Sequence, residues 1–234
     1  MILLAVDLGN SAAKLGLFRG KRLLRRWRIL HGAPLPHLPF PPEVVGISSV
    51  NPPQLRRLLP RLRRLGVPIR VAGKDLRIPW KAVRSRGTGT DRLLATYAAF
   101  LREMGPVAVL DAGTALTLSL VDGRGRFLGG AIAAGPALSL SALARGTAQL
   151  PRLDRPGKAT VGRDTTSAIR SGTALAARGF AREAADLARK TLGRKTVIYL
   201  TGGGADILQG AIAGAKQVDA LVLEGIARTL LPSR

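Results

Sequence analysis

The sequence predicts an α/β protein of two similar domains, each a mixed sheet with flanking helices. Three observations support this fold class. A strand followed by an acid, a glycine and a small polar residue occurs twice, at residues 2–11 and 107–115. Each copy continues into another apolar strand and a turn, and each half of the chain then alternates helical and strand patterns. We therefore expect domains at 1–105 and 106–234, with a hinge near Gly105-Pro106.

The first half is expected to start with a three-stranded meander, whose apolar runs lie at residues 2–6, 14–18 and 22–30. The prolines between residues 34 and 42 exclude regular structure and predict a loop. The remaining elements, in order, are a strand at 44–47, a helix from Pro52 or Pro53 to Leu65, a strand at 67–71, and a helix from Thr90, as its N-cap, to about Met104.

The second half begins with a second three-stranded meander. The expected elements are strands at 107–110, 115–121 and 126–132, a helix at 137–147, a loop at 152–163, a helix at 165–192, a strand at 197–200, a glycine turn at 202–204 before a short helix, and an amphipathic helix at 219–231. Gly172 and Gly179 are positions where the long helix can break.

Composition excludes several classes of protein. The chain has no cysteine and two histidines, which excludes disulfides and thiolate metal sites and disfavours a histidine-rich one. No apolar run approaches the ~18 residues of a membrane span, and the N-terminus does not resemble a signal peptide, so we expect a soluble cytoplasmic protein with no membrane partner. The net charge of +23 favours anionic ligands such as ATP. Nucleic acid is also a possible anionic partner. Aromatic residues make up only 4% of the chain, however, and their pattern suggests no platform for stacking bases.

Asp7 and Asp111 follow the two repeated strands, at the edge where α/β sheets collect ligands. A carboxylate there can hold hydrated magnesium or a monovalent cation beside phosphates, and the glycine lets backbone N–H groups approach them. Short polar or cationic side chains accompany the turns, namely Asn10, Ser11, Lys14 and Thr114. For one copy alone, an ordinary hairpin turn with Asp and Gly is the favoured interpretation, but two copies at corresponding places favour a phosphate site.

A third candidate is the glycine-containing loop at residues 87–92, which ends where a helix starts. Asp91 in the first helical turn is suited to act as a general base, and Arg92 to grip a carboxylate. The simpler interpretation is that Asp91 only interacts favourably with the helix dipole. The glycine turns at 129–135 and 202–204 could bring backbone close to a nucleotide, but each alone is weak evidence.

Together these motifs resemble the type III pantothenate kinases of the actin-like ATPase superfamily. The matching segments are Asp7-Leu8-Gly9-Asn10-Ser11-Ala12-Ala13-Lys14, Gly46-Ile47-Ser48-Ser49-Val50, Gly89-Thr90-Asp91-Arg92, Asp111-Ala112-Gly113-Thr114-Ala115, Gly129-Gly130-Ala131-Ile132, Gly162-Arg163-Asp164-Thr165, Thr201-Gly202-Gly203 and Leu223-Glu224-Gly225. There are departures from the family pattern. Ser11 replaces threonine, Asp164 replaces asparagine, Ala134-Gly135 replaces a Pro-Gly pair, and no tyrosine lies near Ala82, where the family has one that contacts pantothenate.

The resemblance implies two ribonuclease H-like domains and ATP-dependent phosphorylation of pantothenate to 4'-phosphopantothenate, the first step of coenzyme A biosynthesis. It implies Asp91 as the base, and ATP with Mg²⁺ and a monovalent cation, K⁺ or NH₄⁺, as cofactors. By this resemblance the ATP-binding residues are Asp7, Leu8, Gly9, Asn10, Ser11, Ala12, Ala13, Lys14 and Thr114, the pantothenate site is Gly89, Thr90, Asp91, Arg92 and Thr165, and the cation ligand is Asp111.

The resemblance also implies a homodimer, with Thr165 reaching pantothenate across its interface. One alternative is a non-catalytic accessory transcription factor of the same family that binds DNA through its basic surface. Another is a kinase for a different small hydroxyl substrate, which the missing tyrosine leaves open.

Overall fold

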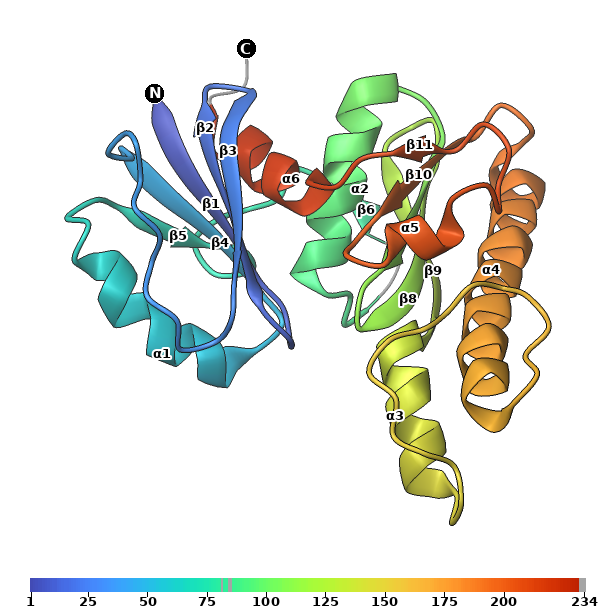
Figure 1. Cartoon of the computed structure of the whole chain (residues 1–234). Coiled ribbons are helices and arrows are strands. Elements are labelled where there is room, and N and C mark those ends of the chain that lie inside the picture. The colour runs from blue at the N-terminus through green and yellow to red at the C-terminus, as the bar shows by residue number, and fades with distance from the viewer. Residues whose placement is uncertain (81, 84–85, 232–234) are drawn as a thin grey trace. The chain divides into compact units, whose positions relative to one another are not determined.

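The computed structural model describes residues 1–80, 82–83 and 86–231 and divides into two compact units (Figure 1). The first unit comprises residues 1–104, residues 125–127 and the chain from Ala220 onward, and the second comprises residues 105–124 and 128–219. The division expected from the sequence, 1–105 and 106–234, stays a prediction. The compact units differ from it because the C-terminal helix packs with the N-terminal half.

The sheet of the first unit has the strand order β3-β2-β1-β4-β5. Its strands are β1 (Ile2–Leu8), β2 (Ala13–Arg19), β3 (Arg22–Ile29), β4 (Val44–Ser49) and β5 (Ile69–Val71). β1, β2 and β3 form the expected antiparallel meander, while β4 and β5 join in parallel and make the sheet mixed. The predicted strand at 67–71 begins two residues late, at Ile69.

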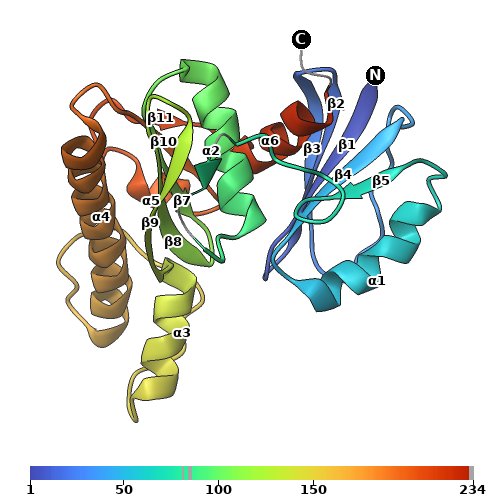
Figure 2. The ribbon, with the colours of Figure 1, turned by 180° about the vertical axis from the view of Figure 1, so that it is seen from behind.

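The two faces of this sheet carry different side chains. Leu4, Val6 and Leu8 of β1 cluster with buried leucines of α1 (Pro52–Arg63), which lies along one face (Figure 2). The other face is lined with small residues, because Gly16 and Gly46 stand in register with Ala5. The C-terminal helix α6 (Leu221–Leu230) packs on this face.

Gly46 allows that close packing. A Cβ atom at this position would lie 2.5 Å from the side chain of Ile226 and 2.7 Å from that of Leu230, both on α6. The helix α2 (Thr90–Glu103) then packs on α6 within the same unit. The short strand β6 (Ala82–Val83) pairs in parallel with Arg126 and Phe127, the residues of β9 that belong to the first unit.

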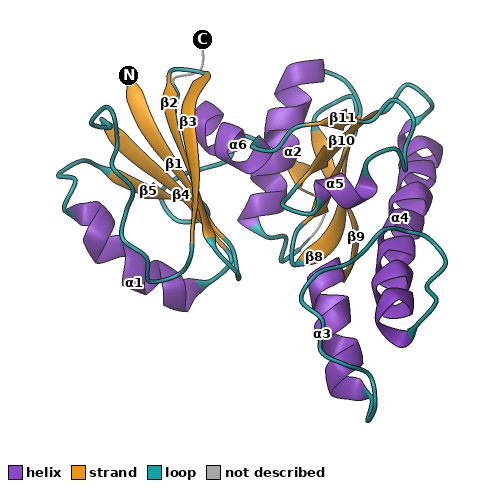
Figure 3. Cartoon of the chain, viewed as in Figure 1, coloured by secondary structure: helices purple, strands orange, loops and turns teal. Residues whose placement is uncertain are grey.

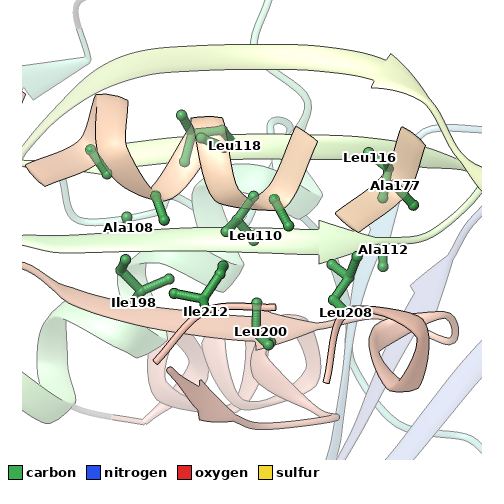
Figure 4. Packing of buried hydrophobic residues seen from close by; sticks show 14 of the residues in the cluster. Ala108, Leu110, Ala112, Leu116, Leu118, Ala177, Ile198, Leu200, Leu208 and Ile212 are labelled. Atoms are coloured by element: carbon green, nitrogen blue, oxygen red, sulfur yellow. The ribbon is translucent and has the colours of Figure 1, made fainter. Parts of the chain in front are cut away.

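The second sheet has the strand order β11-β10-β7-β8-β9-β6, and Figure 3 draws its strands in orange. Besides β6, its strands are β7 (Val107–Ala112), labelled in Figure 2, β8 (Ala115–Val121), β9 (Arg126–Ala134), β10 (Val197–Thr201) and β11 (Lys216–Gln217). The helices are α3 (Pro136–Gly146), α4 (Thr165–Leu192) and α5 (Ala205–Leu208). A buried cluster joins Ala108 and Leu110 of β7, Leu118 of β8 and Leu200 of β10 to Ala177 of α4 (Figure 4). The α/β prediction of two mixed sheets with flanking helices is therefore confirmed.

Some local predictions were wrong. The N-cap of α2 is Gly89, and Thr90 is its first helical residue, because the Thr90 hydroxyl bonds to Ser48 instead of capping its own helix. The helix α4 runs unbroken for 28 residues through Gly172 and Gly179. No helix in the described part of the chain is long and apolar enough to cross a membrane.

Candidate functional site

The first acid-glycine turn joins β1 to β2. Leu8 pairs with Ala13, so residues 9–12 form the turn, and the Gly9 N–H donates to the Ala12 carbonyl oxygen at 3.2 Å. Leu8, Ala12 and Ala13 are buried and hold the base of the turn, while Asn10 and Ser11 are exposed. The turn therefore presents its polar side chains outward on an apolar support, as a phosphate loop requires.

The turn is tied to the start of α1 through Asn10. The Asn51 side-chain amide donates to Asn10 Oδ1 at 3.4 Å, and Asn51 Oδ1 also accepts from the Gln54 N–H as the N-cap of α1. His31 Nε2 lies 3.1 Å from the Asn10 carbonyl oxygen. These contacts restrict the turn before any ligand binds.

A polar row crosses the first sheet beside this turn. Asp7 stands in register with Lys14 on β2 and with Ser48 on β4, so the three side chains share one face of the sheet. Asp7 is 8% exposed, and Ser48 is fully buried. The row follows directly after the small residues on which α6 packs, so the phosphate-binding candidates Asp7 and Lys14 lie at the end of that face.

The start of α2 is attached to this row. Ser48 Oγ and Thr90 Oγ1 are 3.0 Å apart and share a hydrogen bond. Thr90 is adjacent to Asp91, so the bond holds the first turn of α2 beside the strand end that carries Asp7. Within the first unit, the structure thus brings together the two segments that the sequence analysis proposed separately.

Asp91 is half-buried in the first turn of α2. A Cβ atom at Gly89 would lie 2.4 Å from Asp91 Oδ1, so the glycine leaves room for the carboxylate to fold over the helix start. A carboxylate in this position interacts favourably with the positive end of the helix dipole. It is also suited to accept a proton from a bound hydroxyl.

Arg92 is half-buried next to this base. Its guanidinium carbon lies 5.8 Å from the centre of the Phe127 ring, within the range of a cation–π contact. Burial lowers the pKa of Arg92, and the charge of Asp91 opposes that shift. Arginine keeps its proton under all ordinary conditions, so Arg92 remains a cation beside Asp91.

The second acid-glycine turn, in the second unit, is one residue shorter than the first. Ala112 pairs with Leu116, which leaves residues 113–115 as the turn, and the Gly113 N–H donates to the Ala115 carbonyl oxygen at 3.0 Å. Thr114 is exposed, and its carbonyl oxygen accepts from the Gly135 N–H at 3.0 Å. The repeated motif thus folds in two different ways.

Asp111 lies between two threonines. Thr117 on β8 and Thr201 on β10 are its register partners, and a Cβ atom at Gly202 would lie 2.3 Å from Asp111 Oδ1. Gly202 has φ of +95°, a conformation that favours glycine. Carboxylate and hydroxyl oxygens suit a hard monovalent cation, so the residues present fit the expected one.

Magnesium does not require a cluster of protein ligands, because it binds through one or two carboxylates together with phosphates and water. In the described ranges, no three His, Cys, Asp or Glu residues gather as a metal site. The buried carboxylate of Asp7, in its polar row, fits a magnesium ion carried by a nucleotide.

Thr165 is the exposed first residue of α4 in the second unit. The preceding Asp164 caps this helix, and hydrogen bonds from Ser167 lower the pKa of the Asp164 carboxyl. Asp164 therefore supplies the side-chain cap that an asparagine provides equally well. This explains why the family's asparagine can be replaced at this position.

Sequence reasoning did not assign Ser48, Asn51 or His31 to the site. Ser48 had a usable signal, since polar residues directly after a buried strand often face a ligand. Asn51 and His31 are recognisable only from the fold. Ala82, where the family has a tyrosine, lies in β6, and nearby Trp80 donates its indole N–H to the Leu93 carbonyl oxygen at 3.2 Å.

We expect Gly135→Ala to damage the second turn. An added Cβ would lie 2.4 Å from the Gly113 carbonyl oxygen and 2.5 Å from that of Thr114. Both are backbone atoms, so the clash can be relieved only by moving the backbone of the turn. We expect the variant to lower kcat/KM for ATP by about 10- to 100-fold. Steady-state kinetics at varied ATP tests this, with Gly146→Ala, which points into open space, as the matched control. An unchanged KM and kcat for ATP would contradict a role of this turn.

Comparisons with known proteins agree with the motifs. A family model described as type III pantothenate kinase matches residues 3–187. A type III pantothenate kinase of Thermus thermophilus is 36% identical over 97% of this chain and 98% of that protein. One from Dehalococcoides mccartyi is 30% identical over 88% of each. The crystal structure of a conserved protein assigned to the Baf family of transcriptional activators, from Campylobacter jejuni, aligns with a TM-score of 0.65 at 18% identity, covering 97% of this chain and 96% of that one. That similarity concerns the fold alone.

Proposed function

Because the chain belongs to the type III pantothenate kinase family, we infer that it transfers the γ-phosphoryl group of ATP to the hydroxyl of pantothenate. The product is 4'-phosphopantothenate, which enters coenzyme A biosynthesis. The observation that carries this inference is the hydrogen bond between Ser48 and Thr90, 3.0 Å long, because it ties the helix of the candidate base to the phosphate-binding row.

In the proposed mechanism, Asp91 accepts the proton of the pantothenate hydroxyl. The hydroxyl oxygen forms a bond to the γ-phosphorus while the bond from that phosphorus to the β–γ bridging oxygen breaks, and ADP leaves with the electron pair. Asp91 later releases its proton to solvent. Phosphoryl transfer depends mainly on positioning and charge neutralisation, so one base of this kind is sufficient.

The remaining residues bind and orient the substrates. Residues 7–14 hold the ATP phosphates through backbone N–H groups, Asn10, Ser11 and the Lys14 ammonium, and Thr114 contacts the nucleotide. Arg92 holds the pantothenate carboxylate beside Gly89 and Thr90. Thr165 contacts pantothenate across the dimer interface. Asp7 would hold Mg²⁺ and Asp111 would hold K⁺ or NH₄⁺. When bound, these ions neutralise charge that develops on the phosphate oxygens.

A coupled ADP-release assay with purified protein, ATP, magnesium, potassium and pantothenate tests the function. We expect ADP release that requires pantothenate and saturates with it. A folded protein that releases no ADP beyond the pantothenate-free background would contradict the proposal. Omitting potassium tests the monovalent cation separately, and we expect turnover to fall without it.

We propose that the enzyme acts in the cytoplasm as a homodimer. The homodimer is what membership of the family suggests, and the exposed apolar side chains of Ile132 on β9 and of Leu138 and Leu143 on α3, at 65%, 38% and 37% exposure, are our candidates for its interface. Light scattering coupled to size-exclusion chromatography is expected to give the mass of two chains, and Leu143→Glu to give the mass of one. A wild-type mass of one chain would contradict the dimer.

The DNA-binding alternative is not favoured. The arginines at positions 25, 26, 56 and 57 are exposed on β3 and α1. Runs of charge of this kind are usually solvated surface, which needs no DNA partner to explain it. All three acidic residues of the catalytic proposal, Asp7, Asp91 and Asp111, are present, although a protein that only bound DNA would not need them.

A further inference from the structure

The C-terminal helix α6 contacts α2 at very short range. A Cβ atom at Gly225 of α6 would lie 2.2 Å from the carbonyl oxygen of Leu94 and 3.0 Å from its Cα. These are backbone atoms of the helix turn that follows Asp91, so no side-chain movement can relieve such a contact. The glycine at this position therefore sets how closely α2 approaches α6.

A buried carboxylate fastens the same two helices at a second point. Glu224 is 8% exposed, and one of its oxygens accepts from Arg102 of α2, at 2.5 Å from Nη2 and 3.1 Å from Nε. Its other oxygen accepts from Arg228 of α6 at 3.0 Å. Both carboxylate oxygens are thus engaged by charged donors, and removing this charge would leave two arginines beside a neutral group.

The arrangement connects the sheet to the candidate base through α6. The helix α6 rests on the small residues Gly16 and Gly46 of the sheet, and α2 rests on α6. At its start, α2 is held to the sheet by the bond between Ser48 and Thr90. Trp80 adds a second restraint, since its indole N–H donates to the Leu93 carbonyl oxygen of α2 at 3.2 Å. The contacts of Glu224 and Gly225 further restrict the rotation of α2 about its own axis, which decides where the Asp91 carboxylate points.

We propose that Glu224 and Gly225 are positioning residues that orient Asp91 through α2, without touching substrate. This proposal rests on the proposed function, because it assumes that Asp91 is the base. A displacement of a catalytic group by about 1 Å can cost about 10²-fold in rate. Removing either contact is therefore expected to reduce turnover while ATP binding, which depends on the β1–β2 turn, stays intact.

The test compares Glu224→Gln and Gly225→Ala with matched controls on α4, Glu183→Gln and Gly179→Ala. Glu183 is exposed, and a Cβ at Gly179 meets nothing within 4 Å. We expect both test variants to lower kcat by about 10- to 100-fold and both controls to leave it unchanged. The Kd of a non-hydrolysable ATP analogue should stay within about twofold in every variant. Arg102→Lys, which keeps the charge but loses the two-pronged contact, should give a smaller loss of kcat.

A double variant separates positioning from general loss of stability. If Glu224 acts through Asp91, adding Glu224→Gln to Asp91→Asn should reduce the residual turnover no further, since the base is already absent. An additional loss as large as that in the wild-type background would overturn the proposal. An unchanged kcat in Glu224→Gln would also overturn it.

Hydrogen exchange provides a readout that needs no turnover, and it keeps the proposal testable if Gly225→Ala does not fold. In Glu224→Gln, amide protons at the start of α2 should exchange faster, while those of α1 should keep their wild-type rates. Equal acceleration in both helices, or none in α2, would overturn the positioning role. A wild-type protein without pantothenate-dependent turnover would overturn the proposed function instead, and the exchange result would still decide whether α6 orients α2.

Discussion

Replacing Asp91 by asparagine is expected to lower kcat for pantothenate phosphorylation by about 10²- to 10⁴-fold, because general bases contribute rate enhancements of this size. The amide has nearly the same shape as the carboxylate, so the first turn of α2 and the bond between Ser48 and Thr90 should persist. Affinity for ATP should be retained, since the β1–β2 turn is untouched. Single-turnover kinetics and calorimetric titration with an ATP analogue measure the two quantities separately.

The control for this variant is Asp186→Asn on α4. The Asp186 carboxylate is exposed and lies 3.5 Å from Arg189 of the same helix, and neither residue belongs to the candidate site. Its kcat is expected to match the wild type. If Asp91→Asn kept a kcat within about twofold of the wild type, another group would be the base, and the role of residues 89–92 would be limited to binding.

Replacing Asp7 by asparagine is expected to lower kcat/KM for ATP by about 10²- to 10³-fold, the size found when one preorganised electrostatic group is removed. Asp7 is 8% exposed and stands in register with Lys14 and Ser48, so its charge acts in a partly desolvated row. Removing it takes away the carboxylate proposed for Mg²⁺. We therefore expect the variant to need a higher magnesium concentration for half-maximal turnover.

Magnesium titrations of kcat/KM for the wild type, Asp7→Asn and the control Asp154→Asn measure this effect. Asp154 is an exposed loop residue and should leave the magnesium dependence unchanged. A magnesium dependence of Asp7→Asn that matches the wild type would show that the carboxylate has a structural role only.

Much of the fold is encoded locally and was predictable. The apolar runs of β1 and β7 end in the acid-glycine turns, the runs of β2 and β8 follow those turns, and α1 has leucines at helical spacing. The packing of α6 in the first unit was not predictable, because its amphipathic pattern shows that one face is buried without showing against what. The close approach at Gly225 explains the placement only once both helices are known.

The site divides in the same way. Asp7, Asp91 and Asp111 lie in contiguous motifs, so the sequence identifies them directly. Ser48 and Glu224 make hydrogen bonds across more than forty and more than one hundred residues of sequence, which no local pattern reveals. Thr90 shows most clearly where prediction from local sequence fails. The local sequence predicts that its hydroxyl caps α2, whereas the hydroxyl forms a tertiary hydrogen bond with Ser48.

The central claim is that the chain moves the γ-phosphoryl group of ATP onto the pantothenate hydroxyl with Asp91 as the base. Mass spectrometry with ATP labelled by oxygen-18 in its γ-phosphoryl group tests it most directly. The account predicts that the wild type makes phosphopantothenate carrying the labelled phosphoryl group and that Asp91→Asn makes almost none. Labelled inorganic phosphate without phosphopantothenate, or equal product from Asp91→Asn, would contradict it.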